Sequence, residues 1–242
     1  MRSIGIFSVK GGVGKTALAV NLAHISTTLS KRRTLLWDLD AQGAATWTLR
    51  LAAAPNSSAR KGIAGGALAP LVQNTEFAGL DVLAADRSLR NLERQLAEDD
   101  KSKRLRKLLK SLDREYDRII LDCPPGLTEL ADQVFRAVDL LVVPMVPSPL
   151  SIRAFDQLVD HLGRMKDAPP ILPVFTMVDR RKALHRDTVA TWPARPAIPY
   201  AAAIEAMAVS RLPVMARSTS SPAARALGDL WIEIERTLAR LA

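Results

Sequence analysis

The chain has 242 residues, of which 48% are hydrophobic and 24% are charged. This composition is typical of a folded globular protein and excludes a fibrous or intrinsically disordered chain. The single cysteine, Cys123, excludes an internal disulfide framework and a clustered-thiol metal or iron–sulfur site within one chain. We therefore expect a cytoplasmic protein in which Cys123 is a buried packing residue.

The charge balance is unusual, because 34 Lys and Arg residues outnumber 25 Asp and Glu residues and give a net charge of +9. A surplus of this size favours a polyanionic partner, either the phosphates of nucleic acid or an anionic lipid surface. The alternative is a solvated basic surface without a partner. The apolar run at residues 4–9 is too short for a signal peptide core or a membrane span, and prolines interrupt the later run at 140–146.

Short apolar runs rich in Ile, Val and Leu alternate with amphipathic stretches, which predicts βαβ units around a parallel sheet. We expect strands at residues 4–9, 34–37, 80–83, 119–121, 140–144 and 171–177. We expect helices at residues 15–29, 88–112, 127–137, 150–165 and 222–241. The result is one α/β domain over residues 1–242, doubly wound, with a mostly parallel sheet and helices on both faces. Residues 52–70, rich in small residues, Pro and Gly, predict a mobile surface loop.

The stretch "SVKGGVGKTALAV" at residues 8–20 joins the first predicted strand to the first predicted helix. A glycine-rich turn at this point aims backbone N–H groups and a helix N-terminus at one spot, which creates a binding site for phosphate. Lys15 is then placed to reach the β- and γ-phosphates, and the hydroxyl of Thr16 to bind Mg²⁺. A strict P-loop has glycine where this chain has Val9, and Lys10 adds a second cation to the same turn.

Acidic residues follow two later strands of the predicted sheet. "LLWDLDAQGAAT" contains Asp38 and Asp40, and "RIILDCPPG" contains Asp122. Ligands of parallel sheets collect at the carboxyl ends of the strands, so these carboxylates can share a crevice with the glycine loop. Asp122 fits an acid that organises Mg²⁺. Asp40 fits a residue that orients the attacking water or holds the metal shell.

The motifs "KGGVGKT", "DLDAQGAAT", "ILDCPPG" and "VPMVPSPLSIRAFDQL" resemble those of the ParA/MinD family of deviant Walker A ATPases, most of all its short ParA-type members. The resemblance covers nearly the whole chain, with echoes at "FTMVDRR" and "SSPAARAL". It implies a P-loop NTPase-like fold of the SIMIBI type and an ATP–Mg²⁺ cofactor. It also implies a homodimer that closes on ATP, in which Lys10 of one subunit reaches the phosphates bound by the other.

The resemblance further assigns the site residues. By this resemblance, the catalytic residues would be Lys10, Lys15 and Asp40. The metal ion would be bound by Thr16, Asp40 and Asp122. The nucleotide would be held by Lys10, Gly11, Gly12, Val13, Gly14, Lys15, Thr16 and Ala17, with Met177, Asp179 and the loop at residues 198–200 around the adenine. Ala17 stands where the family usually has a second threonine, so one expected phosphate contact is missing.

Non-specific DNA binding by arginines of the C-terminal third is another property of ParA proteins. Residues 177–242 carry 10 Lys and Arg against 6 Asp and Glu, a net charge of +4. The family's DNA motif is displaced in this chain, so the candidates rest on clustering as well as on resemblance: Arg180, Arg181, Lys182, Arg186, Arg211 and Arg217. For each of them, the alternative is a solvated charge.

The predicted C-terminal helix distinguishes between the ParA-type and the MinD-type members of the family. MinD relatives end in an amphipathic helix that binds lipid, which needs Lys and Arg beside the apolar face. Here Asp229, Glu233 and Glu235 share the polar face with Arg236 and Arg240, so we expect the helix to pack against the domain. A second basic stretch from Lys101 has leucines on one helical face, which we expect in the core.

The main hypothesis is a nucleotide-switched ATPase of the ParA type. It would bind DNA non-specifically as an ATP dimer, associate with the nucleoid, and position a plasmid, a chromosome region or a protein assembly. A ParB-like protein or cargo adaptor would stimulate its slow hydrolysis. The rival is a MinD-like regulator at the membrane surface; a phosphotransferase or ligase on the same scaffold has no supporting motif.

Overall fold

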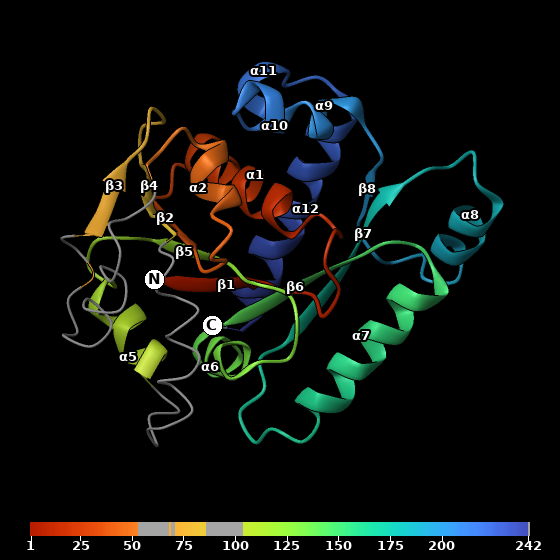
Figure 1. Ribbon diagram of the computed structural model, residues 1–242, viewed down its shortest axis with the longest axis horizontal. Helices are drawn as coiled ribbons and strands as arrows, with labels where there is room; N and C mark the ends of the chain where they lie inside the picture. Colours follow the sequence, from red (N-terminus) through yellow and green to blue (C-terminus); the bar gives the residue numbers. More distant parts are fainter. Residues whose placement is uncertain (53–67, 69–70, 86–103, 242) are drawn as a thin grey trace.

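A computed structural model describes residues 1–52, 68, 71–85 and 104–241. Within these residues the strands form one eight-stranded sheet, in the order β3-β4-β2-β5-β1-β6-β7-β8 (Figure 1). All neighbouring strands are parallel except the pair β3 and β4. The strands are β1 (Arg2–Ile6), β2 (Thr34–Asp38), β3 (Val72–Asn74), β4 (Leu80–Leu83), β5 (Arg118–Asp122), β6 (Leu140–Met145), β7 (Ile171–Val178) and β8 (Ala197–Pro199).

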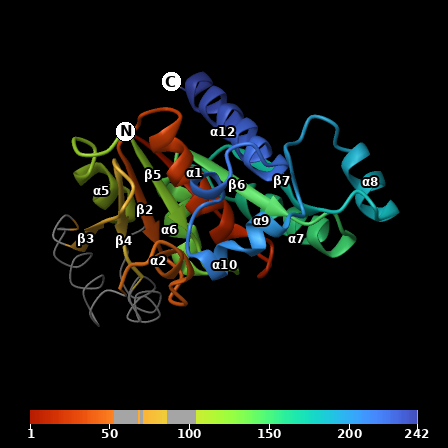
Figure 2. The ribbon, with the colours of Figure 1, turned by 90° about the horizontal axis from the view of Figure 1, so that it is seen from above.

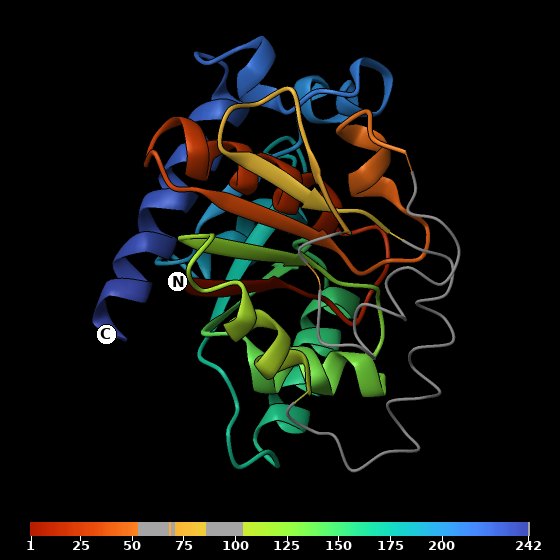
Figure 3. The same cartoon turned by 90° about the vertical axis from the view of Figure 1, so that its left-hand side faces the viewer.

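Helices cover both faces of this sheet, as a doubly wound fold requires (Figure 3). One apolar core joins the sheet to α1 and α12, and the other joins it to α5, α6 and α7. The helices are α1 (Lys15–Thr28), α2 (Ala44–Thr48), α5 (Arg104–Ser111), α6 (Glu129–Ala137), α7 (Pro149–Leu162), α8 (Ala183–Ala190), α9 (Ala202–Glu205), α10 (Met207–Ser210), α11 (Val214–Arg217) and α12 (Pro222–Arg240). The predicted fold class is confirmed.

Several predicted boundaries need correction. β1 ends at Ile6, so residues 7–9 belong to the following loop and not to the strand. Their apolar character has another cause, because Phe7 is fully buried in the core that contains α6. Of the helix predicted at 88–112, only α5 is described; residues 88–103 lie outside the described residues, as does most of the predicted loop at 52–70. The expected apolar face of α5 is confirmed, since its leucines are buried.

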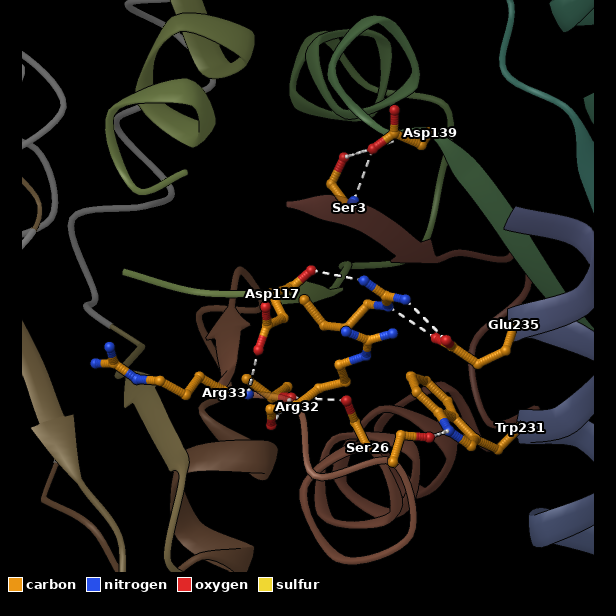
Figure 4. Close-up of polar contacts among 11 residues, drawn as sticks. Ser3, Ser26, Arg32, Arg33, Asp117, Asp139, Trp231 and Glu235 are labelled. Carbon is orange, nitrogen blue, oxygen red and sulfur yellow. Dashed lines mark hydrogen bonds and ion pairs between the residues drawn. The ribbon is translucent and has the colours of Figure 1, made fainter. Parts of the chain in front are cut away.

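The C-terminal helix packs against the domain, as expected from its acidic polar face. Its apolar stripe is buried up to Leu238, and Ser221 caps its N-terminus by accepting a hydrogen bond from the amide of Ala224 at 3.2 Å. Polar contacts add to this packing (Figure 4). Arg118 donates two hydrogen bonds of 2.7 Å to the carboxylate of Glu235.

Two further observations limit the possible architectures. In the part of the chain that the structure describes, no helix is both long and apolar enough to cross a membrane. The segment from β7 to β8, which carries α8, projects from the end of the sheet opposite β3 (Figure 2). A small apolar cluster joins this excursion to the rest of the domain, because Trp192 packs edge-on against Phe155 of α7 and Phe175 of β7.

Candidate nucleotide site

The candidate site lies at the carboxyl ends of β1, β2 and β5, where the loop from β1 enters α1. The backbone of this loop needs glycine, because φ is +73° at Gly12 and +88° at Gly14, in the left-handed region. Gly14 is also the N-cap of α1, and neither a capping side chain nor an acidic residue in the first turn occupies the helix N-terminus. Its first amides and the positive end of the helix dipole are therefore free to bind an anion.

The two lysines of the loop are in different environments. Lys15 is 7% exposed, and its Nζ donates a hydrogen bond of 3.3 Å to the carbonyl oxygen of Lys10. Burial lowers the pKa of Lys15, while the nearby carboxylate of Asp122 opposes that shift. The side chain of Lys10 is exposed. The structure thus places Lys15 inside the site and Lys10 on the surface.

Asp122, the last residue of β5, is completely buried, and neither of its carboxylate oxygens has a partner at hydrogen-bond geometry among the described residues, although the Thr16 hydroxyl lies nearby. Burial raises its pKa well above the usual range, and the charge of Asp38 adds to the increase; the hydroxyl of Thr16 and the ammonium of Lys15 act in the opposite direction. A buried carboxylate without partners is costly in free energy. A divalent cation held between Asp122 and the Thr16 hydroxyl would remove that cost, so these residues fit Mg²⁺.

The two acids of the β2 end have distinct positions. Asp38 pairs in register with Asp122 and is buried. Its carboxylate accepts hydrogen bonds from the amide and the hydroxyl of Thr46, at 2.8 and 2.7 Å, and burial raises its pKa to about 6. Asp40 is only half-buried and accepts a hydrogen bond from the amide of Gln42 at 2.9 Å. Asp40 is thus the acid at the rim of the site.

Sequence reasoning assigned no role to Thr46. The first turn of α2 brings it back over the end of β2, where its hydroxyl also accepts a hydrogen bond of 2.9 Å from the amide of Ala85, after β4. Thr46 therefore fixes Asp38 and joins α2 to two strands. No sequence motif predicts the role of Thr46, because that role depends on a contact between two strand ends that are distant in the sequence.

Next to the phosphate loop is a cavity of about 90 Å³, with mostly apolar walls that include Gly14, Ala17, Met177 and residues 198–200. The hydroxyl of Thr176 joins one wall to the loop by donating a hydrogen bond of 2.8 Å to the carbonyl of Val13. Met177 and residues 198–200, which the resemblance places around adenine, thus do lie beside the phosphate loop.

Asp179 is not among the residues that line this cavity. It accepts two hydrogen bonds of 2.9 Å from Arg181, and those bonds lower its pKa to about 2. Its expected contact with adenine therefore finds less support in the geometry than that of Met177.

The six candidate DNA-binding residues do not form one cluster. Arg180, Arg181, Lys182 and Arg186 lie on the excursion that carries α8, whereas Arg211 and Arg217 lie at the ends of α10 and α11, far from it in both views (Figures 1 and 2). Arg211 already has partners: its guanidinium lies 3.9 Å from the ring centroid of Trp47, and its Nε donates to the carbonyl of Trp47 at 2.8 Å.

With this geometry established, comparison with known proteins defines the class. The sequence profile of a family described as AAA domain matches residues 1–173. The chromosome partitioning protein ParA of Caulobacter vibrioides is 32% identical over 195 residues, which cover 76% of this chain and 72% of that protein. The chain therefore belongs to the AAA domain family of P-loop proteins.

Solved structures agree with this class. The complex of Cyanothece McdA(D38A) with ATP has a TM-score of 0.84 at 19% identity, covering 96% of this chain and 95% of that one. MinD of Pyrococcus horikoshii, complexed with Mg-ADP, has a TM-score of 0.79 at 21% identity, covering 100% and 98%. At these identities the likeness concerns the fold. The ParA relative makes this chain a member of the ParA family of ATPases, and that relative is a chromosome partitioning protein.

Proposed function

We propose that this ATPase forms a dimer on binding ATP, binds DNA non-specifically in that state, and positions a cargo through cycles of slow hydrolysis. The observation that carries the proposal is the pair formed by buried Lys15 and the unpartnered carboxylate of Asp122 at a free helix N-terminus. These groups suit a triphosphate with its metal ion, and two structural neighbours are described with ATP and with Mg-ADP. The proposed location is the nucleoid within the cytoplasm.

Each residue of the site then has a defined task. The amides of the loop and of the first turn of α1 bind the phosphate oxygens, and Lys15 neutralises charge on the β- and γ-phosphates. Thr16 and Asp122 hold Mg²⁺, which when bound would neutralise charge on the transferred phosphoryl group. Asp40, at the rim, orients the attacking water. Ala17 offers no hydroxyl to the phosphates.

Lys10 gives the site its dependence on a second subunit. Its side chain is exposed on the phosphate loop, and its carbonyl oxygen accepts the hydrogen bond from Lys15. In the closed dimer it would bind the phosphates of the partner subunit, so ATP would hold the dimer together. Loss of the γ-phosphate would loosen the dimer and release DNA, and a ParB-like or cargo adaptor protein would accelerate this step.

The test of the dimer is Lys10→Ala, with Lys166→Ala as the matched control because Lys166 is exposed and outside the site. Lys10→Ala should abolish ATP-dependent dimers in analytical ultracentrifugation and abolish hydrolysis, while a nucleotide analogue still binds the monomer. Unchanged turnover in Lys10→Ala would contradict a role across the dimer. Asp40→Ala should trap a dimer that stays on DNA with ATP; release of DNA at the same rate as the unmodified protein would refute the switch.

The MinD-like alternative predicts a lipid partner instead of DNA. The burial of the apolar stripe of α12 supports the DNA proposal, because that stripe is not available to lipid. Cosedimentation with DNA or with anionic liposomes, in ATP and in ADP over a range of salt, separates the two. DNA binding that requires ATP and weakens steeply with salt is expected. Liposome binding that requires ATP would favour the alternative.

A further inference from the structure

A second cavity, of about 520 Å³, lies at the amino ends of the strands, at the opposite edge of the sheet from the nucleotide site. Its walls come from the start of β1, from α5, from the end of α6 and from the segment before β7. Its volume lies in the range of cavities that bind ligands. No residue of the nucleotide site contributes to it.

Two of the three acidic residues in its wall already have strong partners. Asp113 forms an ion pair of 2.9 Å with the amino group of Met1. Asp139 accepts hydrogen bonds from the amide and the hydroxyl of Ser3, at 2.7 and 2.8 Å (Figure 4). It also pairs with Arg2 at 3.4 Å. These contacts fix the floor of the cavity and leave Asp167 as the remaining acid in its wall.

Three cations in the same wall lack such partners. Arg106 and Lys110 of α5 and Arg136 of α6 make no ion pair within 4 Å among the residues that the structure describes, although Lys110 lies near Asp113. Their side chains are exposed or half-buried, so their charge is available at the cavity. The excess of positive charge predicts an anionic ligand.

The chemistry of the walls narrows the class of ligand. Lys110 and Arg136 lie in the last turns of their helices, where the dipole places partial negative charge. A compact anion such as phosphate, seated at the helix ends, would meet that negative charge, whereas carboxylates spread along a chain can lie across the tips of the side chains. The wall also contains exposed apolar surface from Ala168, Pro170 and Leu241.

We propose that this cavity binds an acidic peptide segment of a partner protein, one in which carboxylate and apolar side chains alternate. The carboxylates would pair with Arg106, Lys110 and Arg136, and the apolar side chains would pack against the leucine and proline surface. The site would operate whatever nucleotide is bound, since it shares no residue with the phosphate loop. A partner could therefore hold the protein here without blocking ATP hydrolysis.

The probe is a fluorescein-labelled peptide of alternating glutamate and leucine, measured by fluorescence anisotropy on the full chain without nucleotide. Saturable binding below about 1 mM is expected. Lys110→Glu combined with Arg136→Glu should weaken it by about tenfold or more. The matched control, Arg153→Glu with Arg225→Glu, changes the net charge equally at exposed positions outside the cavity and should bind like the unmodified protein.

Lys110→Gln with Arg136→Gln removes the charges without reversing them and covers the case in which the reversed pair fails to fold. Circular dichroism and basal ATP hydrolysis should be unchanged in this variant. If peptide binding weakens equally in the Arg153 and Arg225 control, binding depends on the net charge of the protein and not on the cavity, and the proposal is overturned. Displacement of the peptide by inorganic phosphate at matched ionic strength would identify a small-anion site instead, and absence of saturable binding would also overturn it.

Discussion

The amino edge of the sheet, where its strands begin, and the carboxyl edge, where they end, differ in whether every buried charged group has a partner. At the amino edge, Arg118 is paired with Glu235, Ser3 with Asp139, and the indole of Trp231 with the hydroxyl of Ser30. At the carboxyl edge, Thr46 holds Asp38, but Asp122 has no partner at hydrogen-bond geometry among the described residues. The charged groups of the amino edge therefore satisfy one another, while Asp122 is left for a ligand to satisfy.

This contrast separates the residues that stabilise the fold from those that serve function. An unsatisfied buried carboxylate reduces stability, and a protein retains it where a ligand makes use of it. Substitutions at the amino edge should accordingly cost stability. Substitutions at the carboxyl edge should cost activity, and some should stabilise the protein without nucleotide.

The largest expected effect is on activity, at the carboxyl edge. Lys15→Ala should reduce ATP hydrolysis by about 100-fold or more, because it removes the buried charge that faces the phosphates. The unfolding temperature should change little, since Lys15 makes one weak hydrogen bond to the loop. Steady-state ATP hydrolysis and thermal unfolding measure these two effects, with Lys166→Ala as the control. Near-normal turnover in Lys15→Ala would refute the assignment of Lys15 to the phosphates.

At the amino edge, Arg118→Ala should lower the free energy of unfolding by about 2 to 3 kcal/mol, because it leaves the carboxylate of Glu235 without its partner. The exposed pair of Arg236 and Glu233, 3.9 Å apart, is the natural comparison. Its loss should cost at most about 0.5 kcal/mol. Urea unfolding of Arg118→Ala and Arg236→Ala tests the difference. Equal losses of unfolding free energy would show that the pair at the amino edge stabilises the fold no more than an exposed pair does.

Asp122→Asn should stabilise the nucleotide-free protein while abolishing the effect of Mg²⁺ on nucleotide binding. The raised pKa means that the folded state binds a proton more tightly than the unfolded state, so stability falls as pH rises through the carboxyl range and stays lower at neutral pH. The asparagine variant should lack this decline and unfold about 2 to 4 °C higher at neutral pH. A lower unfolding temperature for Asp122→Asn than for the unmodified protein would show that the Asp122 carboxylate does not destabilise the fold.

The smallest expected effect concerns His24 of α1, which is buried between the sheet and Phe77. Burial lowers its pKa below the ordinary value of 6.5, and its Nδ1 has no hydrogen-bond partner in the part of the chain that the structure describes. The unfolded state therefore gains the proton first, so stability should decrease as pH falls below about 6.5, by at most about 1.4 kcal/mol per pH unit. His24→Phe should flatten this part of the profile in urea unfolding; an unchanged slope would assign it to other groups.

The sequence was sufficient to predict the central sheet, the phosphate loop and the acids at the strand ends, because each of these depends on local patterns. Apolar runs mark the parallel strands, and the glycines mark a loop that needs positive φ at Gly12 and Gly14. The loop's lysines, Lys10 and Lys15, belong to the same motif, yet their burial differs, and only the fold shows which of them is buried.

The parts that escaped prediction are short or assembled from distant segments. β3 and β8 have three residues each, and α9, α10 and α11 have four each, too few to show a period. The cavity at the amino edge combines side chains from residues 1–3 with others near positions 106, 136 and 168. These side chains come together only when the sheet has formed, so no local sequence pattern can predict the cavity.

The stacking of Arg211 on Trp47 gives the protein an optical reporter. Trp47 follows Thr46, which holds Asp38 at the nucleotide site, and its ring is 57% exposed beneath the guanidinium. A cation close to an indole face alters the emission of that indole. Movement of α2 relative to α10 should therefore appear as a change in tryptophan fluorescence that Trp47→Phe removes, without any added label.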